Sequence, residues 1–214
     1  MTKFEQIRNW LTAAFTEPVG SLMEQFYFDK SQKQFFSIVL TDNFMLDENM
    51  LKRDDITTTY TQAQEDILID RIQRIEYDYE DILAIPRISI DERKDVMQKF
   101  VNSLTDSSLK EILNQRIVNQ DYKTKFDFYF GNEADDFTKQ EWENLKYNFL
   151  QQKVESFLNL NNINIEETTL WEVEAKGSIT IDLKEDTKTE QPSTTLDENE
   201  FKKHWWKFWQ TKTK

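Results

Sequence analysis

Clustered carboxylates are the residues of this sequence whose types and spacing could most readily do chemistry. They occur at Asp54-Asp55, along residues 76–81 and at Asp135-Asp136. Carboxylate oxygens are hard ligands for Mg²⁺ or Mn²⁺, and two such ions can activate water for hydrolysis. If residues 76–80 formed a strand, their acids would share one face and their tyrosines the other. A divalent-metal-dependent hydrolase is therefore one hypothesis. A solvated acidic surface is the simpler interpretation, because these acids show no ligand-spacing motif.

Other residue types exclude several kinds of site. The chain has no cysteine, which excludes disulfides, thiol catalysis and thiolate metal sites. His204 is the only histidine, and the sequence indicates neither a nucleophile nor an orienting partner for it, as a triad would require. The three glycines form no phosphate-binding loop. We therefore assign no catalytic residue, no metal ligand and no cofactor, and expect a surface role for the histidine.

The C-terminal segment, residues 201–214, combines aromatic and basic side chains. On a helix its aromatic residues would share one face and its lysines would surround the rest. Tryptophan is a favoured anchor in protein interfaces, and aromatic residues beside lysines also suit a lipid surface. Three binding surfaces for this segment stay open: the chain's own acidic part, a protein partner and, least favoured, a membrane surface. The residues expected to bind are Phe201, Lys202, Lys203, Trp205, Trp206, Lys207, Phe208 and Trp209.

The charge is strongly acidic and unevenly spread. The net charge is −13, but the five lysines after residue 201 face no acid in the same segment, so residues 1–201 alone carry −18. Nucleic-acid binding needs clustered Lys and Arg, so we expect no nucleic-acid partner. No apolar run is long enough to span a membrane and no signal-peptide pattern opens the chain. We expect a cytoplasmic protein.

Apolar residues at helical spacing predict five helices that would position these groups. Capping boxes at Thr2/Glu5, Ser89/Glu92 and Thr138/Glu141 predict where three of them begin. The predicted helices cover residues 3–15, 62–75, the stripe from Val96 to Leu104, the stripe from Leu109 to Ile117, and the long helix near residues 139–160.

Two β-hairpins and one further strand are predicted from alternating aromatic and β-branched residues. The first hairpin joins residues 25–29 to 34–40, and the second joins residues 171–175 to 179–183. The further strand runs from Tyr77 to Ile85, with Pro86 at its edge or exit. Residues 41–61 show no sustained period and are expected to form a loop.

An aromatic stretch, residues 121–130, precedes the long helix. Its residues Tyr122, Phe126 and Tyr129 have helical spacing, and Gly131-Asn132 is a plausible stop. Together the elements predict an α+β fold: a helical core with small antiparallel β-hairpins or a sheet. We expect one domain over residues 1–183, an acidic flexible linker at 184–200 and the C-terminal segment.

Several residues in the middle of the chain resemble a bacterial family catalogued as Uncharacterised Protein Family 0158. The similarity covers about residues 22–165 and is distributed over strands and helices. It implies a compact α+β domain in a bacterial cytoplasm and brings no established activity. The positions that carry it are Phe26-Tyr27-Phe28-Asp29, Ile85-Pro86, Met97 and Phe100, Leu109 and Leu113, and Trp142 with the helix to Leu158.

One stretch departs from the family pattern. The family usually has a glycine-containing turn and then two phenylalanines three apart beside arginines. Here residues 119–126 contain no glycine, and Tyr122 and Phe126 lie four apart. Lys123 and Lys125 occupy the places of the basic pair. Any function carried by that pair is altered in this chain.

The function indicated by these observations is a non-enzymatic binding or adaptor protein. Its C-terminal segment would dock an unidentified protein partner or the chain's own domain. A metal-dependent hydrolase and peripheral membrane attachment through that segment stay open as alternatives.

Overall fold

A computed structural model describes residues 1–18, 20–21, 23–119, 125–171 and 179–181. These residues belong to one unit that spans Met1–Asp182. Its elements, in chain order, are α1 (Lys3–Thr16), β1 (Glu24–Asp29), β2 (Gln34–Val39), η1 (Leu40–Met45), β3 (Ile56–Thr58), α2 (Gln62–Glu76), β4 (Ile82–Ala84), α3 (Ile90–Ser103), α4 (Ser107–Val118), α5 (Asp136–Leu160), η3 (Ile165–Glu167), β5 (Thr169–Leu170) and β6 (Ile179–Ile181).

The predicted hairpin of β1 and β2 forms the centre of a four-stranded sheet with the order β4-β1-β2-β5. Its antiparallel register places Phe28 opposite Phe35 and Asp29 opposite Gln34. On one edge β4 pairs antiparallel with β1, while on the other β5 pairs parallel with β2. The sheet is therefore mixed, because β5 arrives from α5 rather than through a hairpin.

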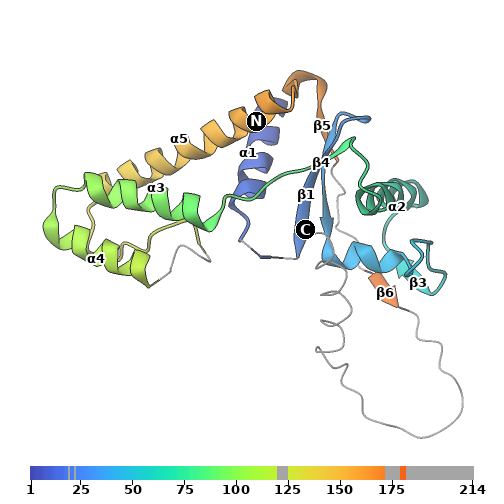
Figure 1. The fold of residues 1–214 in the computed structure, drawn as a ribbon, viewed down its shortest axis with the longest axis horizontal. Coiled ribbons are helices and arrows are strands. Elements are labelled where there is room, and N and C mark those ends of the chain that lie inside the picture. Colours follow the sequence, from blue (N-terminus) through green and yellow to red (C-terminus); the bar gives the residue numbers. More distant parts are fainter. Residues whose placement is uncertain (19, 22, 120–124, 172–178, 182–214) are drawn as a thin grey trace, which may run out of the picture. The chain divides into compact units, whose positions relative to one another are not determined.

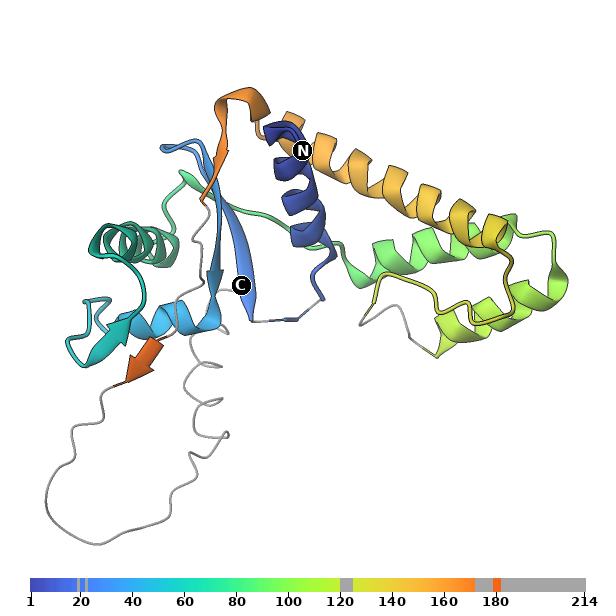
Figure 2. The same ribbon diagram turned by 180° about the vertical axis from the view of Figure 1, so that it is seen from behind.

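One face of this sheet packs against α1. Successive strand side chains point to opposite faces, so Phe26 and Phe28 of β1 and Phe35 of β2 lie together on this side. They meet the apolar stripe of α1, which includes Ile7 and Leu11. Figures 1 and 2 show α1 on one side of β1 and α2 on the other.

The other face carries a separate core cluster. Tyr27, Phe36 and Ile38 contact Leu68 and Ile72 of α2 on this side. The rings of Tyr27 and Phe36 stack with their centroids 5.4 Å apart. A strand pair buried on both faces gives the nearly continuous aromatic runs seen in this sequence.

The helices α3, α4 and α5 extend the first cluster away from the sheet. Trp142 of α5 is fully buried, and Phe100 of α3 lies 5.3 Å from it between ring centroids. At the other end of α5, Phe157 meets Phe15 of α1 edge to face at 5.9 Å. Trp142 therefore packs α5 against α3, and Phe157 packs the other end of α5 against α1.

Residues 125–130 are not helical, so the helix expected from the spacing of Tyr122, Phe126 and Tyr129 is wrong for the part that is described. Phe126, Phe128 and Phe130 are buried while Tyr129 is 81% exposed. This alternation has a period of two residues, which belongs to extended backbone. Phe128 and Trp142 lie 4.9 Å apart between ring centroids, so the segment packs against α5.

Helix boundaries follow the capping residues, with one correction. The boxes at Thr2/Glu5 and Ser89/Glu92 form as predicted. The long helix begins earlier than residue 139, because Asp135 is its N-cap and accepts a 2.7 Å hydrogen bond from the backbone N–H of Thr138. An acidic N-cap also complements the helix dipole.

Two predictions for the connecting segments are also wrong. Residues 41–61, expected to be a loop, contain η1 and β3. The strand expected from Tyr77 begins only at Ile82, because residues 77–80 turn and Asp78 has a φ of +58°. That left-handed conformation breaks the alternation, which depends on extended backbone. Pro86 lies just beyond β4, as expected for a strand exit.

The last described strand has a partner that the sequence did not indicate. β6 pairs antiparallel with β3, with Thr57 opposite Thr180. Of the strand expected to pair with it in the second hairpin, only Trp171 lies in the described residues. The α+β class is confirmed, with helices and a four-stranded mixed sheet in one unit.

Several expectations fall on residues outside the described part of the chain. These are the linker at 184–200, His204 and the C-terminal segment at 201–214. Among the described residues, no helix has the length and apolar character needed to span a membrane.

Candidate functional site

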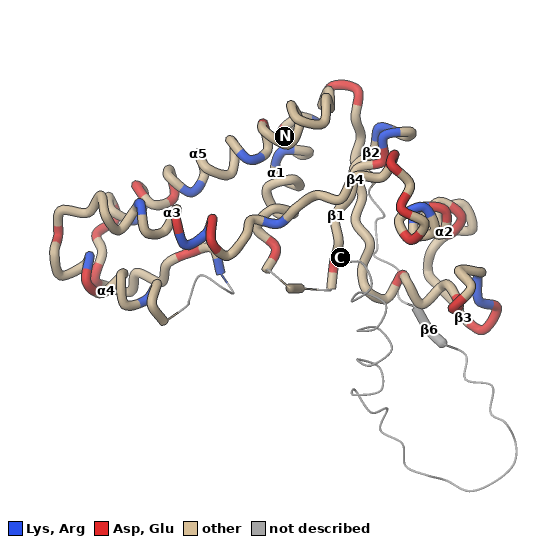
Figure 3. Tube along the Cα trace, in the orientation of Figure 1, with Lys and Arg blue, Asp and Glu red and all other residues tan. Residues whose placement is uncertain are grey.

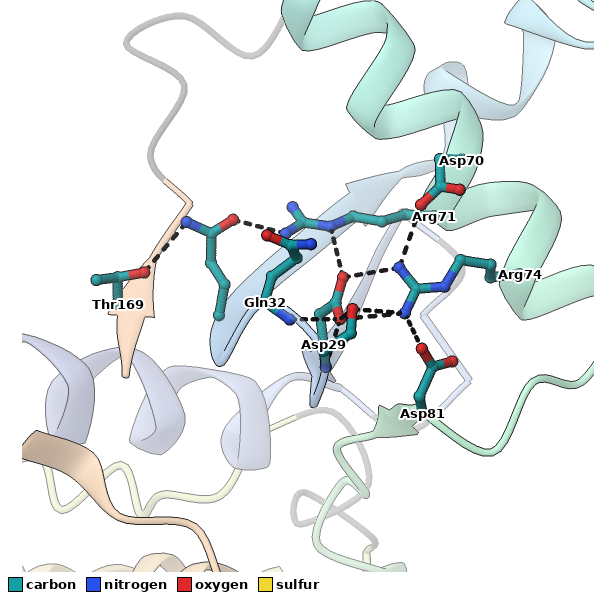
Figure 4. Close-up of polar contacts among 9 residues, drawn as sticks. Asp29, Gln32, Asp70, Arg71, Arg74, Asp81 and Thr169 are labelled. Carbon is teal, nitrogen blue, oxygen red and sulfur yellow. Dashed lines mark hydrogen bonds and ion pairs between the residues drawn. The ribbon is translucent and has the colours of Figure 1, made fainter. Parts of the chain in front are cut away.

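A buried carboxylate, Asp29, organises a cluster of polar contacts between the β1–β2 hairpin and α2 (Figure 4). It ends β1 on the face that meets α2, and its side chain is 1% exposed. Arg74 of α2 binds it with both terminal nitrogens: Nη1 donates to Oδ2 at 2.9 Å and Nη2 to Oδ1 at 3.1 Å. Ser31 donates its backbone N–H and its hydroxyl to Oδ1, and Gln32 adds its backbone N–H. The carboxylate thus closes the hairpin turn and fixes α2 against it.

A second arginine from α2, Arg71, is buried between two aromatic rings. Its guanidinium carbon lies 4.2 Å from the ring centroid of Phe36 and 5.1 Å from that of Trp171. Its Nη2 donates to Oε1 of Gln34 at 2.6 Å, and its Nε lies 3.4 Å from Oδ2 of Asp29. Because Trp171 directly follows β5, this stack links the end of the main sheet to α2.

The charges of the cluster shift one another's pKa values. Burial alone would raise the pKa of Asp29, but hydrogen bonds from Arg74, Ser31 and Gln32 and the charge of Arg74 outweigh it and lower the pKa to about 2. The hydrogen bond to Asp29 raises the pKa of Arg74 further above its ordinary value. Burial lowers the pKa of Arg71, against the opposing charge of Asp29.

This arrangement makes Asp29 a structural anchor. A general acid or base works best with a pKa near the working pH, and its oxygens must be accessible to a substrate. Here Arg74 also pairs with Asp70 at 3.1 Å and with Asp81, so it joins α2 to the residue preceding β4. Figure 3 shows acidic and basic residues on α2, and the cluster uses both signs.

Two more arginines hold the connection between α1 and β1 through backbone carbonyls. Arg93 of α3 is fully buried and donates from Nη2 to the carbonyls of Thr16 and Glu17, at 3.1 and 2.7 Å. Arg87 donates to the carbonyls of Ser21 and Glu24 at 2.5 and 2.6 Å. Guanidinium groups at the end of α1 satisfy carbonyls left free by the helix and complement its dipole.

An open groove lies between α3 and α5, outside the ion-pair cluster. Its volume is about 470 Å³. Val96 and Phe100 of α3 and the half-buried Leu145 and Phe149 of α5 supply its apolar surface. The rest of the lining is polar and consists of Lys99 and Ser103 from α3 and Glu141, Asn144, Asn148 and Gln152 from α5.

The polar lining of the groove is mostly uncharged. Asn144, Asn148 and Gln152 are separated by four residues along α5, so they share one side of the helix. Lys99 and Glu141 are its only charged residues, one of each sign, and neither forms an ion pair with another described residue. One residue beyond the amides, Lys153 pairs with Glu92 and ties α5 to α3.

The acidic clusters noted in the sequence have separate places. Within the described ranges, no three Asp, Glu or His residues gather in a group able to hold a metal ion. Asp135 caps α5, Asp55 binds Arg53, and Asp81 binds Arg74. Asp78 lies in the turn after α2, where the one-sided acidic face expected of a strand does not form.

The residues that carry the family resemblance lie in four surroundings. Met97, Phe100, Phe126 and Trp142 belong to the first core cluster. Tyr27 belongs to the second, where burial raises its pKa to about 12 against the lowering charge of Arg87. Asp29 is in the ion-pair cluster and Pro86 is exposed after β4.

Some predicted site residues cannot be placed. Lys123 lies outside the described residues, as do all eight residues expected to bind through the C-terminal segment: Phe201, Lys202, Lys203, Trp205, Trp206, Lys207, Phe208 and Trp209.

The partners of Asp29 and the groove were not predicted from the sequence. Arg71 could have been found, because it falls on the apolar side of α2 between Leu68 and Ile72. A charged residue in an apolar stripe indicates a buried partner. The groove had a weaker signal, the four-residue spacing of the amides, and nothing local indicated that α3 would lie opposite them.

Comparison with known proteins adds no relative: no family model, no curated protein and no solved structure matches this chain. The resemblance to Uncharacterised Protein Family 0158 therefore stays a prediction.

Proposed function

We propose that this chain is a non-enzymatic binding protein that takes up a segment of a protein partner in the groove between α3 and α5. The observation that carries the proposal is the composition of that groove. Apolar side chains from both helices lie beside hydrogen-bonding side chains that point to the same space. Peptide-binding sites combine these two features, since apolar contact supplies affinity and polar groups fix orientation.

The buried charges support the same proposal. Asp29 and Arg74 bond each other between the hairpin and α2, and Nη2 of Arg93 bonds the end of α1. They hold elements in place, and α3, which forms one wall of the groove, is held to the end of α1 by Arg93. A binding surface built on fixed helices loses less conformational entropy when a partner binds.

We further propose that the C-terminal segment at residues 201–214 contacts the same partner. Its tryptophans supply large apolar contact area and its lysines suit an acidic surface. In the full chain, replacing Trp205 and Trp209 by Ala should then weaken partner binding about tenfold or more. Unchanged affinity would remove the segment from the proposal and leave the groove as the binding site.

A displayed library of random twelve-residue peptides, panned against the full chain, tests the proposed function. We expect enriched peptides that bind with micromolar Kd and lose at least tenfold affinity to the variant Asn148→Arg. That substitution places a long charged side chain in the groove, while the exposed position should leave the fold intact.

The matched control is Asn159→Arg, a change of the same type at an exposed position of α5 that does not line the groove. It should bind like the unaltered chain. Peptides that bind both variants equally, or a library from which nothing is enriched, would overturn the proposed function.

A further inference from the structure

The amide side chains along one wall of the groove are regularly spaced. Residues four apart on an α-helix are about 6 Å apart along its axis, since each residue rises 1.5 Å. Asn144, Asn148 and Gln152 therefore repeat every ~6 Å along the groove. Each amide carries an oxygen that accepts and a nitrogen that donates hydrogen bonds.

An extended peptide offers a matching repeat. In a β-strand each residue advances about 3.3 Å, and the N–H and C=O groups of alternate residues point to the same edge. That edge therefore presents a donor and an acceptor about every 6.6 Å. Over the two steps from Asn144 to Gln152 the repeats diverge by only ~1.2 Å, which flexible side chains can absorb.

The backbone of an α-helical ligand does not offer hydrogen bonds to these amides. Its backbone N–H and C=O groups are already bonded to one another, and only its side chains face outward. The amides themselves have capacity to spare. Asn144 accepts a 3.1 Å hydrogen bond from Gln140 but keeps its amide N–H groups, and no described residue bonds the side chains of Asn148 or Gln152.

The charges of the groove restrict the ligand further. With one lysine and one glutamate in the lining, the groove carries no net charge, although the chain as a whole carries −13. A strongly cationic segment, which the rest of the surface would attract, gains little here. The complementary ligand is largely uncharged, with an acidic group opposite Lys99 and a basic group opposite Glu141.

We infer that the groove binds an extended, largely uncharged segment of a partner protein, with apolar side chains at alternate positions. This inference rests on the proposed function. The three amides pair with the backbone of about five consecutive residues, because each amide bonds every second residue of the strand. The alternate side chains enter the apolar part of the groove formed by Val96, Leu145 and Phe149.

The test uses the full chain and the tightest peptide from the panned library. Each backbone nitrogen of the peptide is methylated in turn, which removes one N–H donor at a time. We expect affinity to fall about fivefold or more at every second residue and little between them. The variants Asn148→Leu and Gln152→Met, which keep side-chain size, should each weaken binding by a similar factor. Asn159→Leu is the control and should have no effect.

Two results would overturn the inference, and they are distinguishable. If the peptide loses affinity to Asn148→Arg but becomes helical on binding, with sensitive positions three or four residues apart, the ligand is a helix and the proposed function stands. If Asn148→Arg binds the peptide like the unaltered chain, both the inference and the proposed function fail.

Discussion

At the scale of single residues, Asp29 joins the hairpin turn to α2. Its carboxylate is the common acceptor for two arginines of α2 and for the hairpin turn that follows β1. A buried ion pair need not stabilise a protein relative to an apolar pair. Removing one partner is costly, however, because it leaves a charge buried without compensation.

The substitution Asp29→Asn should therefore lower the free energy of unfolding by about 3 kcal/mol at pH 7, since it leaves Arg71 and Arg74 without a counter-charge at this position. Urea denaturation measures the change. Asp70→Asn is the matched control: Asp70 binds the same Arg74, but its side chain is 62% exposed. The control substitution should lower the free energy of unfolding by no more than about 0.5 kcal/mol. Equal losses in the two variants would contradict the anchoring role.

The free energy of unfolding of Asp29→Asn should also depend less on pH than that of the unaltered chain. The pKa of Asp29 falls from 3.8 to about 2 in the folded chain, so its contribution is present above pH 3.8 and is lost as the pH falls toward 2. That difference corresponds to about 2 kcal/mol, at ~1.36 kcal/mol for each pKa unit. The stability gap between the unaltered chain and Asp29→Asn should therefore narrow between pH 5 and pH 2. A constant gap would show that the charge of Asp29 is not the cause.

At the scale of elements, the segment of residues 125–130 shows how a spacing can mislead. Phe126 and Tyr129 are three residues apart, which fits a helix, but Phe126, Phe128 and Phe130 fit a strand-like alternation equally well. The choice depends on Trp142, whose ring lies 5.9 Å from that of Phe126 and 4.9 Å from that of Phe128 between centroids. Such a tertiary contact is absent from the local pattern.

The alternation predicts unequal effects of neighbouring substitutions. Phe128→Ala should lower the free energy of unfolding by about 3 kcal/mol, because it leaves a cavity against Trp142 and Phe100. Tyr129→Ala, one residue along, should lower the free energy of unfolding by about 0.5 kcal/mol, since Tyr129 is 81% exposed and its ring lies 5.7 Å from the guanidinium carbon of Arg116. Thermal or urea unfolding compares them. Similar losses would contradict the alternation of buried and exposed residues in this segment.

Other elements were predictable because their signals are local. The capping boxes predicted where α1 and α3 begin, and the aromatic runs predicted the strands β1 and β2. The end of β4 just before Pro86 is another local effect. The pairing of β6 with β3 was not predictable, because these strands are more than a hundred residues apart and neither sequence specifies its partner.

At the scale of the whole described unit, the central sheet separates two cores. The cluster with α1 continues into α3, α4 and α5, whereas the cluster with α2 is smaller. The ion pairs of Asp29 lie on the same side of the sheet as α2. The α+β class followed from counting helical and alternating stretches. The groove did not, because it is formed by residues of α3 and α5 about fifty positions apart.

The central claim is that this groove binds a peptide segment. The most direct measurement is a titration of the ¹⁵N-labelled full chain with the tightest selected peptide, followed by amide chemical shifts. The account predicts saturable shifts concentrated at Val96–Ser103 and Glu141–Gln152, with the side-chain amides of Asn148 and Gln152 among the largest. Saturable shifts that avoid these two stretches, and centre on α2 or the hairpin instead, would contradict it.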